Sequence, residues 1–262
     1  YQQAYYDRHY PKRVAAVRDQ LAHPLFRSYH ERFAERILDA APAGRRPGAP
    51  LRLIELGCGE AFVGSAVARV AARRNLPIAY SGADLSAAAL ELAREVVDGE
   101  LIVGDAIEVA AGLPAASQDV AVIKNLLHHL DDPAALLRQA ARLVGPAGRV
   151  VVIEACGANP QFWVFSTFAP KREKYFFYGR RRNLAALEDA GLTILSSQRY
   201  SILPYEVAFH IRPGVFRRLL STNDPTTIGR FSRLDDRLAR AAPAFSSYII
   251  WVTAPLEGTN RA

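Results

Sequence analysis

Cysteines and long apolar runs are scarce in this sequence. The only cysteines are Cys58 and Cys156, and in the sheet predicted below they end two strands that are separated by a third. Neighbouring strands are spaced by about 4.8 Å, so the two residues would lie roughly 10 Å apart, too far for a disulfide. No uninterrupted apolar stretch reaches membrane-spanning length, and no signal-peptide pattern opens the sequence. We therefore expect a cytoplasmic protein without a membrane span.

The composition favours one large folded unit over several small ones. The chain has 262 residues, of which 50% are hydrophobic, enough for one sizeable α/β core with additional segments. The net charge is +7 and the isoelectric point is near 9.6, which permits an acidic partner. The basic residues are nevertheless scattered and often stand beside Asp or Glu, so charge alone does not indicate nucleic-acid binding.

The stretch from Leu51 to Gly64 reads LRLIELGCGEAFVG and predicts a strand, a tight glycine turn and a helix. Gly57 and Gly59 let the backbone turn sharply and let a ligand lie against it, because neither has a Cβ atom. A dinucleotide-binding fingerprint would have a third glycine at position 62, where this sequence has Phe62. A pyrophosphate is therefore a poor fit to this turn.

A second strand is predicted over 77–84 and ends in Asp84. Ser86 is a good N-cap for the Ala/Leu/Glu-rich helix that is expected to follow as far as residue 97. Asp84 lies about twenty-five residues after the first strand, the βαβ spacing at which a carboxylate can bind both hydroxyls of a ribose. The alternative is a surface aspartate that only caps the helix.

Further strands are predicted over 101–103, 119–125, 149–155, 192–200 and 246–254. Between the fourth and fifth of the seven predicted strands, Asp132 is expected to cap a helix with Pro133 at its first position. Alternation of strands and helices predicts a doubly wound α/β protein.

Two motifs together give the chain a family resemblance. The segment ELGCGEAFVG, with Glu55 ahead of the glycines, resembles the first motif of class I S-adenosylmethionine-dependent methyltransferases, and NLLHHLDDP after the fourth strand resembles their small-molecule branch. The resemblance covers roughly residues 51–200 and the last strand. It implies a Rossmann-like, seven-stranded, mainly parallel sheet with an antiparallel last strand, and S-adenosyl-L-methionine as the cofactor.

The resemblance also implies where the cofactor binds. In that family the glycine turn wraps the methionine end, the acid after the second strand holds the ribose, and the acid after the third strand accepts from the adenine amino group. Carried onto this sequence, the cofactor-binding residues are Glu55, Gly57, Cys58, Gly59, Asp84, Leu85, Asp105, Ala106 and Asn125. No metal site is expected.

The pair His128-His129 would stand beside the methyl donor in such a fold. Imidazole is suited to accepting a proton from a hydroxyl or an acidic carbon near neutral pH, and His129 is the candidate catalytic residue. The alternative is that a histidine there only fastens the loop to backbone carbonyls. Lys124 interrupts an apolar strand, and its ammonium is expected to extend to the surface, with a carboxylate partner as the alternative.

The remaining segments are expected to surround this site. Residues 1–50 would form a helical N-terminal lid, broken near Pro24, and residues 51–262 the cofactor-binding domain. Substrate-cap segments are expected at 156–180 and 201–246. Candidates in the lid for contact with the cofactor are Tyr5, Tyr6, Tyr10 and Arg27.

The acceptor is expected to be a small, partly apolar molecule. Methylation of a base amino group usually requires Asn or Asp followed by Pro-Pro and an aromatic after the fourth strand, a motif that is absent here. A basic cluster precedes a helix that Asn183 is expected to cap, and its members are Lys171, Arg172, Lys174 and the arginines at 180–182. This cluster suggests an anion site and an acidic acceptor, the alternative being a solvated basic patch. A nucleic-acid (RNA) methyltransferase and a non-catalytic cofactor-binding partner protein stay as alternative functions.

Overall fold

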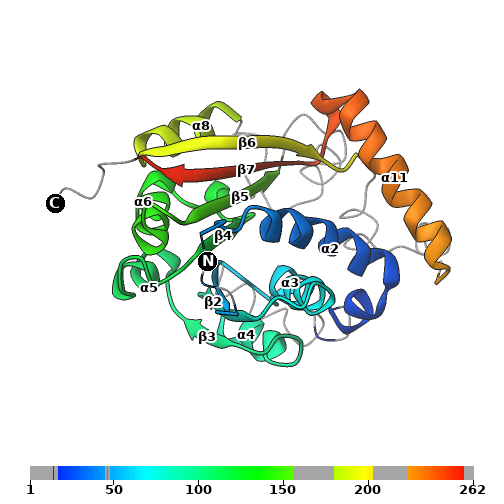
Figure 1. Ribbon diagram of the computed structural model, residues 1–262, viewed down its shortest axis with the longest axis horizontal. Helices are drawn as coiled ribbons and strands as arrows, with labels where there is room; N and C mark the ends of the chain where they lie inside the picture. Colours follow the sequence, from blue (N-terminus) through cyan, green and yellow to red (C-terminus); the bar gives the residue numbers. More distant parts are fainter. Residues whose placement is uncertain are drawn as a thin grey trace.

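The computed structural model describes residues 14, 17–44, 46, 48–155, 180–202 and 223–256. Several expected segments fall outside this range: Tyr5, Tyr6, Tyr10 and Cys156, most of the cap segment at 156–180, and residues 203–222 of the second cap segment. The described part is organised around one mixed sheet that helices cover on both faces (Figure 1).

The sheet has seven strands in the order β3-β2-β1-β4-β5-β7-β6. Strands β1 to β5 pair in parallel, whereas β7 runs antiparallel to both β5 and β6. This confirms the predicted fold class, including the antiparallel last strand. The strand bounds are β1 Leu51–Leu56, β2 Ile78–Asp84, β3 Glu100–Val103, β4 Val120–Lys124, β5 Arg149–Ala155, β6 Leu192–Tyr200 and β7 Tyr248–Pro255.

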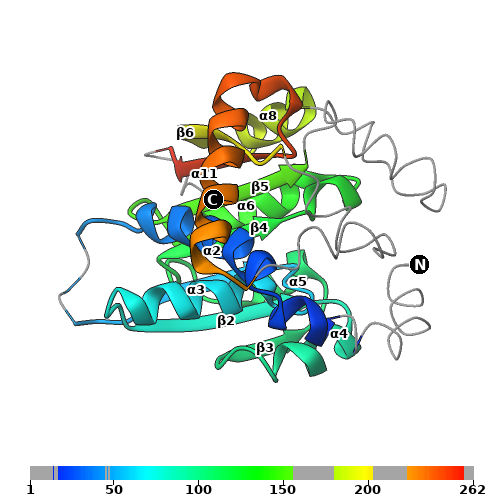
Figure 2. The same ribbon diagram turned by 90° about the vertical axis from the view of Figure 1, so that its right-hand side faces the viewer.

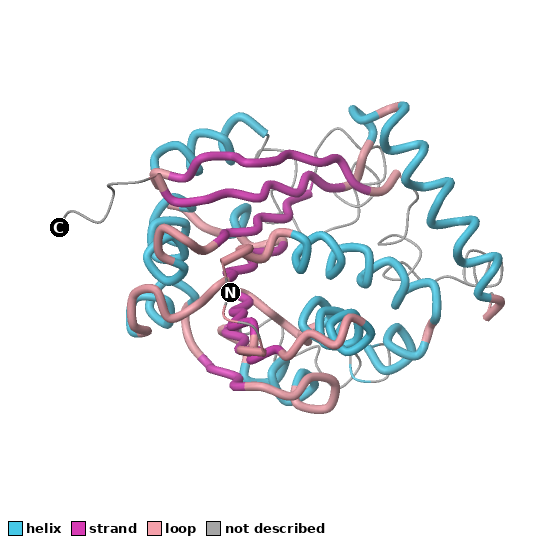
Figure 3. The backbone as a smooth tube through the Cα atoms, viewed as in Figure 1, coloured by secondary structure: helices cyan, strands magenta, loops and turns pink. Residues whose placement is uncertain are grey.

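Two hydrophobic clusters lie on the two faces of the sheet. Leu53 belongs to the cluster under α2 (Pro24–Asp39), α3 (Phe62–Arg73) and α4 (Ala87–Ala93), while Ile54 belongs to the cluster under α5 (Ala106–Gly112), α6 (Pro133–Val144) and α8 (Arg180–Asp189). Figure 3 shows the strands between these helices. Because both faces are covered, the central strands read as nearly continuous apolar runs rather than as an alternating pattern.

Helix starts follow the capping residues in the sequence. Ser86 and Asp132 each accept a backbone hydrogen bond in the first turn of α4 and α6, and the His23 ring accepts one from Leu25 in front of α2. The starts at Ser86 and Asp132 were predicted as caps, and a break near Pro24 was predicted, but the capping role of His23 was not. Helix α11 (Pro225–Ala241), which Asp224 caps and Pro225 opens, lies in what was expected to be a cap segment and was not predicted as a helix.

Helix α2 forms part of the main core. Leu25, Phe33 and Ile37 are at most 1% exposed and pack in the same cluster as β1 and β4. Helix α11 lies across α2 (Figure 2). The division at residue 50 into lid and domain stays a prediction, but the described part of that segment shares its core with the sheet. No helix among the described residues is long and apolar enough to span a membrane.

Candidate active site at the carboxyl edge of the sheet

The glycine turn after β1 is held against the end of β2. The backbone N–H groups of Gly57 and Cys58 both donate to the carbonyl of Ala83, at 2.8 and 3.0 Å. Gly57 has φ +77° and Gly59 has φ +52°, a region that glycine adopts without the strain of a Cβ. A Cβ on Gly57 would approach the side chain of Leu126 to 2.8 Å, whereas one on Gly59 would have nothing within 4 Å. Gly59 therefore borders open space, as a cofactor-binding turn requires.

Cys58 faces the interior from this turn. Its side chain is buried and its carbonyl accepts from the N–H of Ala61 at 2.8 Å. Burial raises the pKa of the thiol well above its ordinary value. The thiol is therefore inert, and only the backbone of Cys58 is left to approach a ligand.

Glu55 is bound to the protein on the inner side of the turn. It is 2% exposed, and its Oε2 accepts from the N–H of Gly64 at 3.1 Å and from the hydroxyl of Tyr80 at 2.8 Å. Gly64 is in the first turn of α3, so the carboxyl caps that helix. Burial raises the pKa of Glu55 to about 7, against the opposing effects of the Tyr80 hydrogen bond and the charge of Lys124.

Asp84 is placed as a diol-binding acid should be. Its Oδ2 accepts from the N–H of Gly59 at 2.8 Å and its Oδ1 from the N–H of Ser86 at 2.9 Å. These bonds orient the carboxylate between the glycine turn and α4. Each carboxylate oxygen has two acceptor positions, so one on each oxygen is left for a ribose hydroxyl. Burial raises the pKa of Asp84, against the effect of its two backbone hydrogen bonds.

The residues after β3 and β2 border the same edge. Asp105 caps α5, since its Oδ1 accepts from the N–H groups of Ile107 and Glu108. Its Oδ2 makes no hydrogen bond within the described chain. Ala106 is nearly buried and Leu85 is 43% exposed. An adenine amino group facing Oδ2, with Leu85 against the ring, is compatible with this arrangement.

The loop after β4 is held by a buried acid that sequence reasoning missed. Glu154 in β5 accepts from the N–H groups of Leu126 and Leu127 at 2.9 and 2.7 Å, and its other oxygen lies 2.8 Å from Nδ1 of His128. His128 is buried, whereas His129 is exposed. Protein atoms around the His129 ring, together with His128, lower its pKa to about 3. His128 is thus the structural member of the pair, and His129 is the one free to face a ligand.

Lys124 ends β4 and Asn125 follows it, on the side of the sheet that α2 covers. Asn125 has φ +54°, and its amide donates to the hydroxyl of Tyr248 at 3.3 Å. The Lys124 ammonium lies 5.7 Å from the ring centre of Phe33 and 5.3 Å from that of Tyr248. Both rings are buried, and Lys124 itself is partly buried. That its ammonium extends to the surface stays a prediction.

The structure corrects part of what was expected around the arginines at 180–182, whereas the anion site itself stays a prediction. Helix α8 already includes Arg180, and Asn183 is buried inside the helix rather than capping it. Arg182 donates to the carbonyls of Leu130 and Asp131 at 2.7 and 3.0 Å, which ties α8 to the loop after β4. Arg182, one member of the basic cluster, therefore has a structural role that joins two segments distant in the sequence. Lys171, Arg172 and Lys174 lie outside the described residues.

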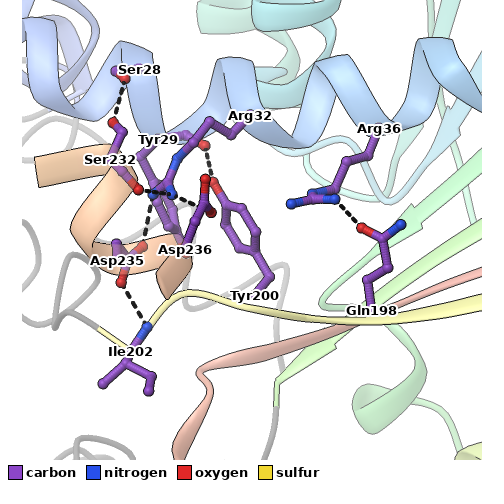
Figure 4. Close-up of polar contacts among 10 residues, drawn as sticks. All are labelled: Ser28, Tyr29, Arg32, Arg36, Gln198, Tyr200, Ile202, Ser232, Asp235 and Asp236. Atoms are coloured by element: carbon purple, nitrogen blue, oxygen red, sulfur yellow. Dashed lines mark hydrogen bonds and ion pairs between the residues drawn. The ribbon is translucent and has the colours of Figure 1, made fainter. Parts of the chain in front are cut away.

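Helix α2 is anchored from outside by an ion-pair clasp, defined as Arg32, Asp235, Asp236 and Ile202 (Figure 4). Arg32 donates to Asp235 at 2.8 Å and to Asp236 at 2.9 Å, and Asp235 also accepts from the N–H of Ile202 at 2.8 Å. The clasp joins α2 to α11 and to the end of β6. Further contacts run from Ser28 to Ser232, from Tyr200 to the carbonyl of Tyr29, and from Arg36 to Gln198.

The fold and this edge together define a class of protein. Parallel α/β sheets bind ligands at the carboxyl ends of their strands. Here that edge presents a glycine turn next to open space, with Asp84 hydrogen-bonded to the turn. The residues present therefore fit an adenosyl cofactor, and the roles expected for Asp84 and the glycine turn stay predictions. The strand order with an antiparallel β7 is that of class I S-adenosylmethionine-dependent methyltransferases.

Comparison with known proteins agrees with this class. A sequence model described as a methyltransferase domain matches residues 22–197, more than half of the chain. The chain belongs to the methyltransferase-domain family of S-adenosylmethionine-dependent enzymes.

Individual curated relatives match only part of the chain. The chain is 36% identical over 113 residues to a ubiquinone biosynthesis O-methyltransferase of Thiobacillus denitrificans, covering 40% of this chain and 45% of that protein. It thus spans less than half the length of such curated relatives.

Two solved structures share the fold. One is the plantazolicin methyltransferase BamL in complex with a triazolic desmethylPZN analog and SAH, with TM-score 0.59, 14% identity and coverage of 97% and 94% of the two chains. The other is a SAM-dependent methyltransferase from Archaeoglobus fulgidus, with TM-score 0.57, 14% identity and coverage of 87% and 93%. At these identities the likeness concerns the fold alone.

Proposed function

We propose that this protein transfers a methyl group from S-adenosyl-L-methionine to a hydroxyl oxygen of a small, partly apolar acceptor. The observation that carries the proposal is Asp84, which is held by Gly59 and Ser86 with acceptor positions left over beside the open side of the glycine turn. The choice of oxygen comes from the relatives, which are O-methyltransferases. The curated relatives also support a small-molecule acceptor over nucleic acid.

The reaction depends mainly on how the methyl donor and the acceptor are aligned. Held by Asp84 and the glycine turn, the cofactor would supply a sulfonium-linked methyl group to the acceptor oxygen, and the electrons of the sulfur–methyl bond would return to sulfur. The protein must hold the acceptor in line with that bond and exclude water. The hydroxyl proton must also leave, and we assign its removal to His129. This ring is exposed and, with a pKa of about 3, neutral at physiological pH, although the low pKa weakens it as a base.

The proposal is tested by methyl transfer from S-adenosylmethionine labelled in its methyl group. The purified protein would be incubated with phenols, aliphatic alcohols and nuclease-treated or untreated cell extract, and products would be identified by mass spectrometry. Label on an oxygen of a small molecule, lost in Asp84→Ala, is the expected result. Label that disappears on nuclease treatment would indicate a nucleic-acid substrate instead. Cofactor binding without label transfer to any fraction would favour a non-catalytic partner protein.

A further inference from the structure

Lys124 is a half-buried cation without a counter-ion in the described chain. It is the last residue of β4, at the edge where ligands of this fold bind, and no ion pair or hydrogen bond joins its ammonium to a described residue. Lysines are seldom buried unless they are paired, because removing the ammonium from water costs free energy. Most other cations near α2 do have partners, for example Arg32 with Asp235 and Arg69 with Glu31.

The surroundings of Lys124 stabilise its charge only in part. Both aromatic ring centres lie within the 6 Å over which a ring attracts a cation. Glu55 is close enough for the charge of Lys124 to lower its pKa. The Oε2 of Glu55 is nevertheless taken by Gly64 and Tyr80, and the two side chains form no ion pair. An anion could therefore still be bound by this ammonium.

The aromatic walls are held in place before any ligand arrives. The Phe33 and Tyr248 rings pack edge to face with centres 5.6 Å apart, and Asn125 holds the Tyr248 hydroxyl. Phe33 is on α2, which the clasp anchors to α11 and β6. A site whose groups are already positioned loses little free energy to ordering when a ligand binds.

We propose that Lys124, between Phe33 and Tyr248, is a recognition site for a carboxylate of the acceptor. The inference rests on the proposed function, because it takes the acceptor to bind at this edge. It deepens that function by naming the acceptor class as hydroxy acids with an apolar body. A carboxylate is also present at the methionine end of the cofactor. We assign Lys124 to the carboxylate of the acceptor rather than to that of the cofactor because of the strand order. Tyr248 belongs to β7, which lies beyond β5, whereas Asp84 and Asp105, the acids expected to bind the cofactor, lie on the opposite side of β1.

The test compares a charged ligand with its neutral isostere. Binding of cinnamate and of cinnamamide would be measured by calorimetry with S-adenosylhomocysteine present, for the wild type, Lys124→Met and Lys124→Arg. Lys124→Met keeps the apolar stem and removes the charge, and Lys124→Arg keeps the charge. Arg138→Met, on the exposed side of α6 on the other face of the sheet, is the matched control.

We expect the wild type to bind cinnamate at least about tenfold more tightly than cinnamamide, as a charge-assisted hydrogen bond would provide. Lys124→Met should lose this preference, while Lys124→Arg and Arg138→Met should retain most of it. Affinity for S-adenosylhomocysteine alone should be the same in all four proteins. Absence of a preference in the wild type, or its persistence in Lys124→Met, overturns the inference.

Two further outcomes separate this inference from the proposed function. A loss of S-adenosylhomocysteine affinity in Lys124→Met would assign the lysine to the cofactor carboxylate, which overturns the inference alone. Failure of the wild type to bind S-adenosylhomocysteine at all would refute the proposed function as well.

Discussion

Asp84 links the backbone of the glycine turn to the expected ribose. Replacing it with alanine removes both a charge-assisted acceptor for the diol and the bonds to Gly59 and Ser86. Asp84→Ala should therefore weaken binding of S-adenosylhomocysteine by about 1.5–3 kcal/mol, measured by calorimetry. Asp119→Ala, which loses an ion pair with Arg52 at the opposite end of the strands, is the control and should bind normally. A folded Asp84→Ala protein with unchanged affinity would remove the ribose assignment.

The two adjacent histidines are expected to behave differently when replaced. His129→Ala should lower turnover with little change in cofactor affinity, at the low end of the roughly 10²–10⁴-fold range for general bases because its pKa is so low. Because the ring is neutral well above pH 3, its titration should not appear in the pH–rate profile between about pH 5 and 9. His128→Ala should instead destabilise the fold, since it leaves the buried Glu154 with one partner fewer. Normal turnover in His129→Ala would make that histidine structural.

At the scale of elements, the clasp joins α2, α11 and β6 through one buried acid. Asp235 is fully buried, and its replacement by alanine leaves the Arg32 charge and the Ile202 amide without this partner. Asp235→Ala should cost about 3–5 kcal/mol of unfolding free energy, the range for breaking a buried pair from one side. The neighbouring Asp236 bonds the same arginine but is 29% exposed, so Asp236→Ala should cost at most about 1 kcal/mol. Equal losses in urea unfolding would mean that burial does not set the strength of the clasp.

At the scale of the whole molecule, Glu55 couples stability to pH. Its pKa is about 7 in the folded protein, whereas the ordinary value for an unburied glutamate is 4.5. Between these two pH values the folded state therefore binds more protons than the unfolded state. Unfolding free energy should therefore fall as pH rises from about 4.5 to 7, by a few kcal/mol, and level off above. The lowered pKa of His129 acts in the opposite direction between about pH 3 and 6.5, so the wild type alone does not isolate Glu55.

The comparison that isolates Glu55 is with Glu55→Gln. Glutamine keeps an oxygen for Gly64 and Tyr80 and cannot ionise. Unfolding free energies of both proteins would be measured by denaturant titration from pH 4 to 8. The value for Glu55→Gln minus that for the wild type should rise with pH, because only the wild type loses stability as Glu55 ionises. A difference that does not depend on pH would show that Glu55 ionises as readily in the folded protein as in the unfolded chain.

Local sequence determined most of the framework of this protein. The alternation of apolar strands and helices, the glycines at 57 and 59, and the caps Ser86 and Asp132 are all signals within a few residues of the structure that they produce. They predicted the order of the strands along the chain, and the family resemblance supplied the antiparallel last strand. Helix α11 was missed although Asp224 and Pro225 mark its start, because the segment was interpreted as a cap over the site.

Only the tertiary structure decided which side chains meet. Tyr80 bonds Glu55, Glu154 holds His128 and Asp235 holds Arg32 between elements far apart in the sequence. The same holds for Lys124, whose two rings come from α2 and β7. Periodicity and capping describe neighbours along the chain, whereas these contacts depend on the order of strands in the sheet and on the helices packed over it. The sequence alone therefore determined the order of strands and helices, and the packing of the folded chain decided which charged side chains of the described residues are buried in pairs.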